Sequence, residues 1–540
     1  MEVINQIQIV FVLLAAMVAL TFLANRWSVP APLILVPSGV ILGFTPWFPR
    51  IELNPDLILF VFLPPLVYIG AFSSWQALRK NLKPIFFLSF GLVLFATVVV
   101  AVVAHRFIPG WSWAVAFVLG AIVAPTDDVA AAAVIRGFSL PHRIVSVLEG
   151  EALLNDATAL TAFKFSSAAV VSGSFSFAVA AVNFLGIVLG EVGFGLLLGW
   201  VLSKLRQKVK DPTVAIALSF LTPFVAYLPA ERLGGSGVLA TAVVGSYLGS
   251  RRSEILTPGI RLAGLPIWEF MAFILNNLLF LVTGLQLRAV LEKTSDLPAR
   301  VLFYDGVLIS AVVIFSRVLW VFSETYVPRL LSPHLRKVGP KPVWRHVFMI
   351  SWTGMRGSIS LAAAFGIPAA TEAGIPFPGR SLIIFIAFCV ILSTLVLQGM
   401  TLAPLIRWLG VDRDGKKEQR GAHYQEARAR IEAGQAAIAE IDTWTKQGAC
   451  SEPVARQLRR YYRDQIRKFS HHRDEESDEQ FAHLSKRAIE LAIKALGTER
   501  AKVLELREDG AISDSVLRLI ELDLDLQEMR LGRDAHSEDN

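Results

Sequence analysis

Long apolar runs separated by short polar connections dominate the first three quarters of the chain. Runs long enough to span about 30 Å of hydrocarbon occur at thirteen places. They are residues 7–24, 29–45, 56–73, 84–105, 111–135, 144–171, 177–204, 212–231, 235–250, 268–288, 300–323, 345–371 and 380–409. After residue 410 the pattern changes to the mixed apolar and charged spacing of soluble helices. The pattern predicts an all-α polytopic membrane protein, with a transmembrane domain at 1–410 and a small helical domain at 411–540.

The first run, residues 7–24, has no basic leader and is followed directly by a second apolar run. We therefore expect it to be a retained first helix rather than a cleaved signal peptide.

The fifth and twelfth runs are interrupted in a way that an ordinary lipid-facing helix would not be. The fifth contains Pro125 beside Thr126, and the twelfth contains the segment Gly354-Met355-Arg356-Gly357-Ser358. The first to sixth runs and the eighth to thirteenth runs form two six-helix units, and the two breaks lie at matching places in them. Because one run, the seventh, lies between the units, they would cross the membrane in opposite directions. Interrupted helices at corresponding positions point to a transporter binding site. The alternative is that proline and glycine only kink these helices, but both breaks also carry ionisable residues.

Composition and charge support the membrane assignment. Of 540 residues, 54% are hydrophobic and 18% are charged, which is too apolar for an average soluble protein. Residues 411–540 hold 23 Lys and Arg against 27 Asp and Glu, so the net +7 of the chain comes from residues 1–410 and does not indicate nucleic-acid binding. Numbering the runs in order puts eighteen Lys and Arg on one side of the membrane and seven on the other. The positive-inside rule then predicts an external N-terminus and a cytoplasmic C-terminal domain in the cell membrane.

The sixth run carries several carboxylates at membrane depth. Glu149, Ala152 and Asp156 follow i, i+3, i+7 spacing on one helix face, and Glu151 and Asn155 form a neighbouring i, i+4 pair. Asp156 is thirteen residues beyond the basic loop at 143, roughly 20 Å along a helix. Charge at that depth is costly, so we expect a functional site.

The chemistry of this site favours monovalent cations and protons. Desolvation opposes the ionised form of Asp156, so the carboxylate holds a proton or a small hard cation. Competition between Na⁺ and H⁺ for one carboxylate couples their fluxes in opposite directions. Asp127, Asp128 and the Thr126 oxygens, beside the break in the fifth run, could complete a shell of hard ligands. No cofactor motif accompanies these residues, and residues 411–540 have no GxxxxGK[ST] phosphate-binding loop.

Several strings resemble a known family. APTDDVAAAAV, LEGEALLNDATAL, LPPLVYIGAF, WTGMRGSISLA and IWEFMAFILNNLLFLVTGLQL look like the bacterial sodium/proton exchangers of the monovalent cation:proton antiporter-1 family, which are related to the animal exchangers. The resemblance covers most of residues 1–410. It implies thirteen helices, a homodimer, a dimer domain with a moving core domain, crossed unwound helices at the site and usually electroneutral exchange of Na⁺, with Li⁺ or K⁺ as further candidates.

The resemblance also implies roles for individual residues. Asp156 would carry the ion or proton, Asp127 would be its partner on the unwound helix, and Thr126 would be a further Na⁺ ligand. Asn155 stands where electrogenic relatives tend to have a second Asp, which fits one-for-one exchange.

A structural ion pair in the core is a further implication. Glu151 would pair with a core arginine, Arg317 by first choice and Arg356 as the other candidate. A buried charge without a partner would be severely destabilising, so we interpret this pair as structural.

Three positions depart from the family pattern. Ala152 replaces a small hydroxyl residue, Ile69 stands where an acid is common in the third run, and Asp128 stands where an uncharged residue is common. One hypothesis is that Asp128 compensates for the missing oxygen ligands.

The alternative function is a gated cation channel or a membrane sensor with a cytoplasmic output domain. Residues 411–540 are expected to form three or four regulatory helices, with a capping-box pattern starting at Ser477. An enzyme is disfavoured because the membrane part has no nucleophile-base or metal-ligand constellation.

Overall fold

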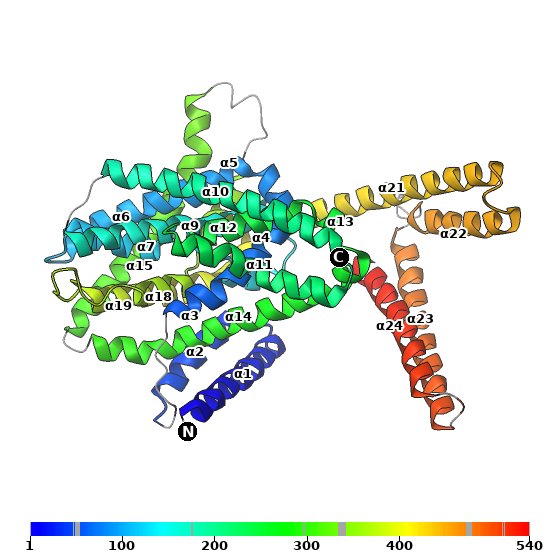
Figure 1. Ribbon diagram of the computed structural model, residues 1–540, viewed down its shortest axis with the longest axis horizontal. Helices are drawn as coiled ribbons and strands as arrows, with labels where there is room; N and C mark the ends of the chain where they lie inside the picture. The colour runs from blue at the N-terminus through cyan, green and yellow to red at the C-terminus, as the bar shows by residue number, and fades with distance from the viewer. Residues whose placement is uncertain are drawn as a thin grey trace. The chain divides into compact units, whose positions relative to one another are not determined.

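The computed structural model describes residues 2–46, 48, 55–173, 177–294, 297–332, 342–470, 478–509, 511 and 513–538. The regular secondary structure of these residues is helical, and the only strand-like pairing among them is an isolated bridge between Ala370 and Pro376. The expectation of an all-helical polytopic membrane protein is confirmed (Figure 1). The predicted capping residue Ser477 lies outside the described residues.

The chain separates into two units, Met1–Asp412 and Arg413–Asn540, close to the predicted domain boundary. In the first unit the helices up to the site are α1 (Glu2–Arg26), α2 (Ala31–Phe44), α3 (Pro55–Leu57), η1 (Ile58–Phe62), α4 (Leu63–Lys80), α5 (Leu82–Phe86), η2 (Phe87–Leu92), α6 (Val93–Phe107), α7 (Trp113–Val123), α8 (Asp128–Ile135) and α9 (His142–Ser172). They are followed by α10 (Phe177–Lys208), α11 (Pro212–Arg232), α12 (Gly237–Ser250), α13 (Arg252–Ile255), α14 (Pro258–Lys293), α15 (Ala299–Leu331), α17 (Trp344–Trp352), α18 (Ser358–Phe365), α19 (Arg380–Ser393), η3 (Thr394–Gln398) and α20 (Gly399–Leu409).

Each of the thirteen predicted runs coincides with one helix or one interrupted series of helices. Among the described residues, eight helices are long and apolar enough to cross a membrane, and α2, α7 and α12 are shorter apolar helices. The exact number of crossings and the inverted six-helix repeats stay predictions.

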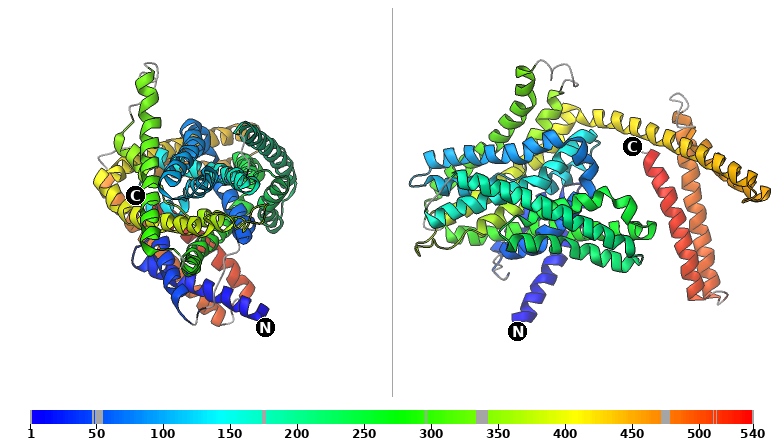
Figure 2. Two further views of the ribbon diagram at one scale, coloured as in Figure 1. Left: turned by 90° about the vertical axis from the view of Figure 1, so that its left-hand side faces the viewer. Right: turned by 45° about the horizontal axis from the view of Figure 1, so that its top comes forward.

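Two groups of helices pack within the first unit. In the α12 group, α12 packs against α4, α10 and α11, and α14 packs against α2. In the α15 group, α15 packs against α6, α17 and α19, while α7 packs against α6 and α9. The two groups meet where α4 contacts α9. In the left view of Figure 2 the C-terminal part of α15, in green, stands across the direction of most other helices of this unit.

Small residues allow close helix contacts in the α12 group. A Cβ added to Gly245 of α12 would lie 2.9 Å from the Tyr68 carbonyl oxygen of α4. In lipid, where the hydrophobic effect does not drive helices together, such close packing is a main source of helix association.

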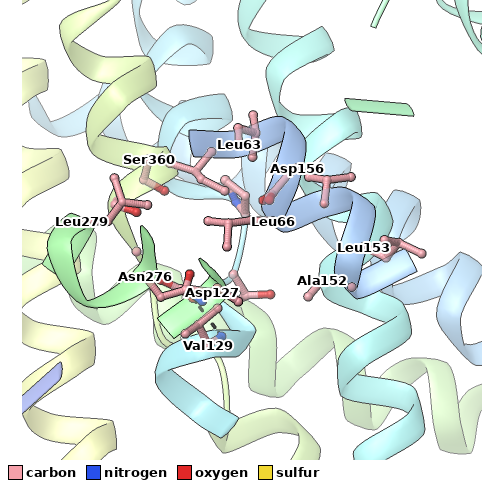
Figure 3. Close-up of a pocket in the computed structure, with 18 of the residues that line it drawn as sticks. Leu63, Leu66, Asp127, Val129, Ala152, Leu153, Asp156, Asn276, Leu279 and Ser360 are labelled. Atoms are coloured by element: carbon pink, nitrogen blue, oxygen red, sulfur yellow. Dashed lines mark hydrogen bonds between the residues drawn. The ribbon is translucent and has the colours of Figure 1, made fainter. Parts of the chain in front are cut away.

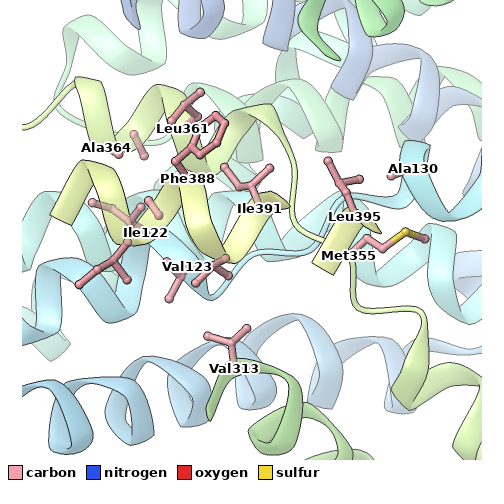
Figure 4. Packing of buried hydrophobic residues seen from close by; sticks show 14 of the residues in the cluster. Ile122, Val123, Ala130, Val313, Met355, Leu361, Ala364, Phe388, Ile391 and Leu395 are labelled. Atoms are coloured by element: carbon pink, nitrogen blue, oxygen red, sulfur yellow. The ribbon is translucent and has the colours of Figure 1, made fainter. Parts of the chain in front are cut away.

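The largest buried apolar cluster fills the α15 group. Figure 4 shows Ile122 and Val123 of α7 packed with Val313 of α15 and with Phe388 and Ile391 of α19. This cluster holds the half-helices that flank both breaks in fixed positions.

A π-helical segment, η1, precedes two prolines in the third predicted run. Pro64 and Pro65 lack backbone N–H groups, and their rings crowd the carbonyls four residues earlier, which lie inside η1. The wider π turn relieves this conflict without ending the helix.

The second unit contains α21 (Val411–Lys446, which begins just before the boundary), α22 (Glu452–Ser470), α23 (Asp478–Glu508) and α24 (Asp514–Glu538). Arg459 of α22 pairs with Asp442 of α21 at 2.7 Å, and Arg500 of α23 pairs with Asp525 of α24 at 2.6 Å. The unit is therefore built from two helical hairpins, each joined by an ion pair.

Candidate functional site

Both interruptions expected from the sequence are present in the structure. α7 ends at Val123 and α8 begins at Asp128, and α17 ends at Trp352 and α18 begins at Ser358. Each break frees backbone groups at membrane depth, and such groups need partners from protein or water.

The two breaks cross and supply these partners to each other. The Asp127 amide donates a hydrogen bond to the Met355 carbonyl at 2.7 Å. The Arg356 guanidinium donates to the Ala124 carbonyl at 2.6 Å, at the C-terminal end of α7, where the helix dipole favours a cation. Arg356 is completely buried, so this contact is part of the core.

Asp127 caps the N-terminus of α8. Its Oδ1 accepts hydrogen bonds from the Val129 amide at 2.9 Å and the Ala130 amide at 3.4 Å. Gly357 lies directly against the other carboxylate oxygen, and a Cβ at this glycine would overlap it. The second break, between α17 and α18, therefore fixes the direction in which the Asp127 carboxylate points.

A cavity of about 190 Å³ adjoins the crossing. Asp127 and Thr126 line it from the first break, Asp156 lines it from α9, and Asn276 and Ser360 line it from α14 and α18. Figure 3 shows the labelled side chains of Asp127 and Asp156 on the wall of this cavity. Asp156 is 8% exposed, so its carboxylate is almost fully removed from bulk solvent.

α9 presents different residues to the cavity and to the protein interior. Glu149, Ala152 and Asp156 line the cavity, whereas Glu151 and Asn155 are buried away from it. This division follows the helical spacing read from the sequence. The cavity wall therefore has a methyl group at position 152 where a hydroxyl would supply an oxygen ligand.

Glu151 forms the centre of a buried network behind the cavity. Both of its carboxylate oxygens contact the Arg317 guanidinium of α15, the second through Nη2 at 2.9 Å. Arg317 also donates to the Ile350 carbonyl at 3.0 Å, and the Thr126 hydroxyl donates to Glu151 Oε1 at 2.9 Å. Arg317, rather than Arg356, is thus the residue that faces Glu151.

Asn155 belongs to this network and does not line the cavity. Its amide nitrogen donates to the Thr126 hydroxyl at 2.7 Å and to the Thr126 carbonyl at 3.0 Å. The Thr126 hydroxyl is thereby shared between Glu151 and Asn155. Of the residues singled out from the sequence, Asp127, Thr126 and Asp156 share the cavity, while Asn155, Glu151, Arg317 and Arg356 support it from behind.

Asp128 is described only through its backbone, as the first residue of α8. Its side chain lies outside the described part of the structure, so the hypothesis that it supplies a ligand stays a prediction.

The sequence reasoning did not identify the contributions of Ser360 and Ser358, which line the cavity from α18. Asn276 of α14 was not singled out as a site residue either, and it also lines the cavity. The string GSISLA contained the signal, since two small hydroxyl residues directly follow the second break.

The oxygen-rich wall suits a hard monovalent cation as cargo. Carboxylate, hydroxyl and amide oxygens all reach the cavity, at Asp127, Asp156, Ser360 and Asn276. Among the described side chains no group of three or more His, Cys, Asp or Glu is arranged as a metal centre.

A bundle of apolar helices with two crossed interruptions and two carboxylates in a buried cavity defines a helical ion transporter. Comparison with known proteins gives the family. The profile of the family described as "Sodium/hydrogen exchanger, transmembrane" matches residues 12–408, and the chain belongs to this family.

Individual proteins similar to this chain agree with the family assignment. The chain is 32% identical over 545 residues to an uncharacterized Na⁺/H⁺ exchanger of Mycobacterium bovis, covering 98% of this chain and 97% of that protein. It is 36% identical to the sodium, potassium, lithium and rubidium/H⁺ antiporter of Bacillus pumilus, covering 76% of this chain and 64% of that protein. The fold matches the sodium proton antiporter MjNhaP1 from Methanocaldococcus jannaschii with a TM-score of 0.61 at 19% identity, over 76% of this chain and 99% of that structure.

Proposed function

We propose that this protein is a secondary-active antiporter that exchanges Na⁺, with K⁺ and Li⁺ as further cargo candidates, for protons at Asp156. The observation that carries the proposal is the placement of the Asp156 and Asp127 carboxylates on one cavity beside the crossed breaks. Removing an ionised carboxylate from water is expensive, so Asp156 is neutralised either by a proton or by a cation before the helices around it move. Membership of the sodium/hydrogen exchanger family supports this assignment.

The residues of the cavity and those of the buried network around Glu151 have different roles in the proposal. Asp156 carries the cation or the proton, and Asp127 contributes a second negative charge to the cation while it caps α8. Thr126 and Asn155 are positioning residues, because their hydrogen bonds join the first break to Glu151. The Glu151–Arg317 pair is structural, since both side chains are buried and paired with each other.

Electroneutral exchange is part of the proposal. The residue beside Asp156 is the neutral Asn155, so the pair offers one exchangeable proton for each monovalent cation. Asp128 is kept as a candidate ligand, and unchanged apparent Na⁺ and K⁺ affinities in Asp128→Ala would remove it.

Alternating access is supported by contacts on opposite sides of Asp156 along α9. The cavity extends from Asp156 toward the N-terminal end of α9, past Ala152 to Glu149. On the other side, about 12 Å along the helix, Lys164 pairs with Glu231 of α11 at 2.7 Å and donates to the Gly235 carbonyl at 2.9 Å. Since Lys164 is on the helix that carries Asp156 and Glu231 is in the α12 group, this bridge closes the far side of the site.

The excess of basic residues on one side supports a topology with the N-terminus outside and residues 411–540 in the cytoplasm. In this topology the cavity faces the cytoplasm and the Lys164–Glu231 bridge is external. A homodimer in the cell membrane and a regulatory role for residues 411–540 complete the proposal.

The test uses the purified full-length protein in sealed vesicles with a pH gradient and an internal pH dye. The native protein is expected to dissipate the gradient when Na⁺ is added, with a saturable rate, and Asp156→Asn is expected to abolish this response. Glu292→Gln, at an exposed residue of α14 outside the cavity, is the matched control and should retain exchange. Sodium-dependent proton movement in a folded Asp156→Asn protein would refute the proposal.

The same vesicles separate the alternatives. A gated channel would pass a current that follows the membrane potential without counter-movement of protons, and a sensor would move neither ion. Comparing Na⁺, K⁺ and Li⁺ across pH 5 to 9 then gives the cargo preference.

A further inference from the structure

Arg206, in the last turn of α10, is a buried cation that does not line the cavity of Asp127 and Asp156. The residue is 5% exposed, and it lies in the α12 group rather than beside the crossed breaks. Its Nη1 donates to the Tyr68 hydroxyl at 3.0 Å and its Nη2 donates to the Thr222 hydroxyl at 2.7 Å. Both partners are neutral.

The charge of Arg206 has no counter-ion among the described residues, and its buried Nε has no hydrogen-bond partner there. Burying a guanidinium costs several kcal/mol unless a negative group compensates it. Its position at a helix C-terminus does not remove the problem, because its donors go to α4 and α11 instead of the α10 carbonyls. An anionic ligand beside the guanidinium would compensate this charge.

A second cavity, of about 50 Å³, lies against Arg206. At about 10–15 Å³ per water it has room for several waters or for one small tetrahedral oxyanion. Tyr68 and Trp268 form its inner wall, with ring centroids 5.3 Å apart, and the Trp268 indole is fixed by a 2.9 Å hydrogen bond to Ser219. The site is therefore rigid and built around the guanidinium.

A second arginine stands at this cavity. Arg261, in the first turns of α14, lines it and is exposed. The N-terminal ends of α11 and α14 lie at the same end of the helix group, and their dipoles favour a negative ligand.

The surroundings match the level of lipid headgroups. α10 ends, and α11 and α14 begin, beside this cavity, so it lies at one end of the membrane-spanning helices. Next to Arg261 the surface is apolar, with Leu262 71% and Leu265 42% exposed, and Leu265 also lines the cavity. A phosphate bound at the two arginines would leave acyl chains along this apolar surface.

We propose that the cavity between Arg206 and Arg261 is a binding site for a phosphate-type oxyanion at the membrane surface. Arg206 provides the buried positive charge of the inner wall, and Arg261 provides the outer contact. The phosphate comes either from a phospholipid headgroup or from solution, and this source is decided by the two arms of the experiment.

The experiment measures the melting temperature of the delipidated full-length protein in neutral detergent, with Na⁺ and pH held constant. One arm adds inorganic phosphate in exchange for chloride at constant ionic strength. The other adds phosphatidylglycerol, compared with uncharged diacylglycerol of the same chains. A ligand that binds only the folded state raises the melting temperature in a saturable way, so we expect such a rise in the arm that holds the true source.

Three variants test whether the rise in melting temperature depends on the two arginines of the cavity. Arg261→Gln is expected to raise the half-saturating concentration about tenfold, as the loss of one charge-assisted hydrogen bond predicts, and Arg206→Gln is expected to abolish the rise. Arg252→Gln, at an exposed arginine of α13 that does not line the cavity, should respond like the native protein. If Arg206→Gln fails to fold, Arg261→Gln decides the question. The absence of a saturable rise in both arms, or a native response in Arg261→Gln, would overturn the proposal.

Discussion

The amide of Asp127 and the carbonyl of Met355 are joined by a 2.7 Å hydrogen bond, which connects the breaks of two helices that are more than two hundred residues apart in the chain. The same Asp127 also caps α8 and lines the cavity. One residue therefore both joins the two breaks and places a carboxylate on the cavity wall. This relationship makes the structural and the ionic roles of Asp127 separable by substitution.

Asp127→Asn and Asp127→Ala are expected to differ. Asparagine is as good an N-cap as aspartate, so Asp127→Asn should melt close to the native protein but require more Na⁺ for half-maximal exchange. Alanine loses the cap as well, at a cost of about 0.5–2 kcal/mol, so Asp127→Ala should also melt at a lower temperature. Thermal unfolding and vesicle exchange on the same preparations check both effects. Equal melting temperatures for the two variants would contradict the capping role.

Gly357→Ala tests the close approach of the second break to the carboxylate. The added Cβ would overlap the Asp127 carboxylate, so we expect loss of most exchange activity in a protein that still reaches the membrane. Gly70→Ala is the matched control, because Gly70 also lines the cavity and has open space around an added Cβ. Exchange that is reduced equally in both variants would mean that loss of glycine, rather than contact with Asp127, is responsible.

The Glu151–Arg317 pair is expected to act on stability. Removing one member of a buried ion pair costs about 3–5 kcal/mol, because the other charge is left without a partner. Glu151→Gln and Arg317→Met should each unfold at a much lower temperature, and the double variant should recover part of the loss. The pair Arg288–Glu292, in which Glu292 is exposed and Arg288 partly exposed, provides the control, since breaking it should cost about 1 kcal/mol or less. Additive losses in the double variant would argue against direct pairing.

The Lys164–Glu231 bridge is expected to hold the far side of the cavity closed. Lys164→Gln should increase the labelling of Ser360→Cys by a membrane-impermeant thiol reagent from outside the cell, about two- to fivefold for a pair of this exposure. The charge-swapped variant Lys164→Glu with Glu231→Lys should restore low labelling. The background for these variants has Cys389 and Cys450 replaced by Ser, so that the introduced thiol is the target of the reagent. Labelling that does not change in Lys164→Gln would exclude the bridge as a gate.

The helical spacing of α9 was enough to predict which side chains share a face. Glu149, Ala152 and Asp156 were expected together, and the structure has them together on the cavity. The breaks at Pro125 and Gly354–Gly357 could also be predicted from the sequence, because proline and glycine act locally on the backbone. Such features depend only on residues near one another in the chain.

Other features depend on how helices are rotated against each other, which local spacing does not determine. Arg317 was the first choice as the partner of Glu151 only through the family resemblance, because the pairing depends on the relative rotation of α9, α15 and the second break. The contributions of Ser360 and Asn276 to the cavity have the same origin. Helix ends also differed, since α14 begins at Pro258, ahead of the apolar run predicted at 268, because helices continue past the hydrocarbon layer.

The division of α9 into two faces has a consequence for engineering. Positions 149 and 152 can be varied to alter cargo preference while the Glu151 and Asn155 contacts that hold the protein together are left untouched. A library confined to the first face, for example one that introduces serine or threonine at Ala152, should therefore yield a high proportion of folded proteins in which ion discrimination is the property that changes.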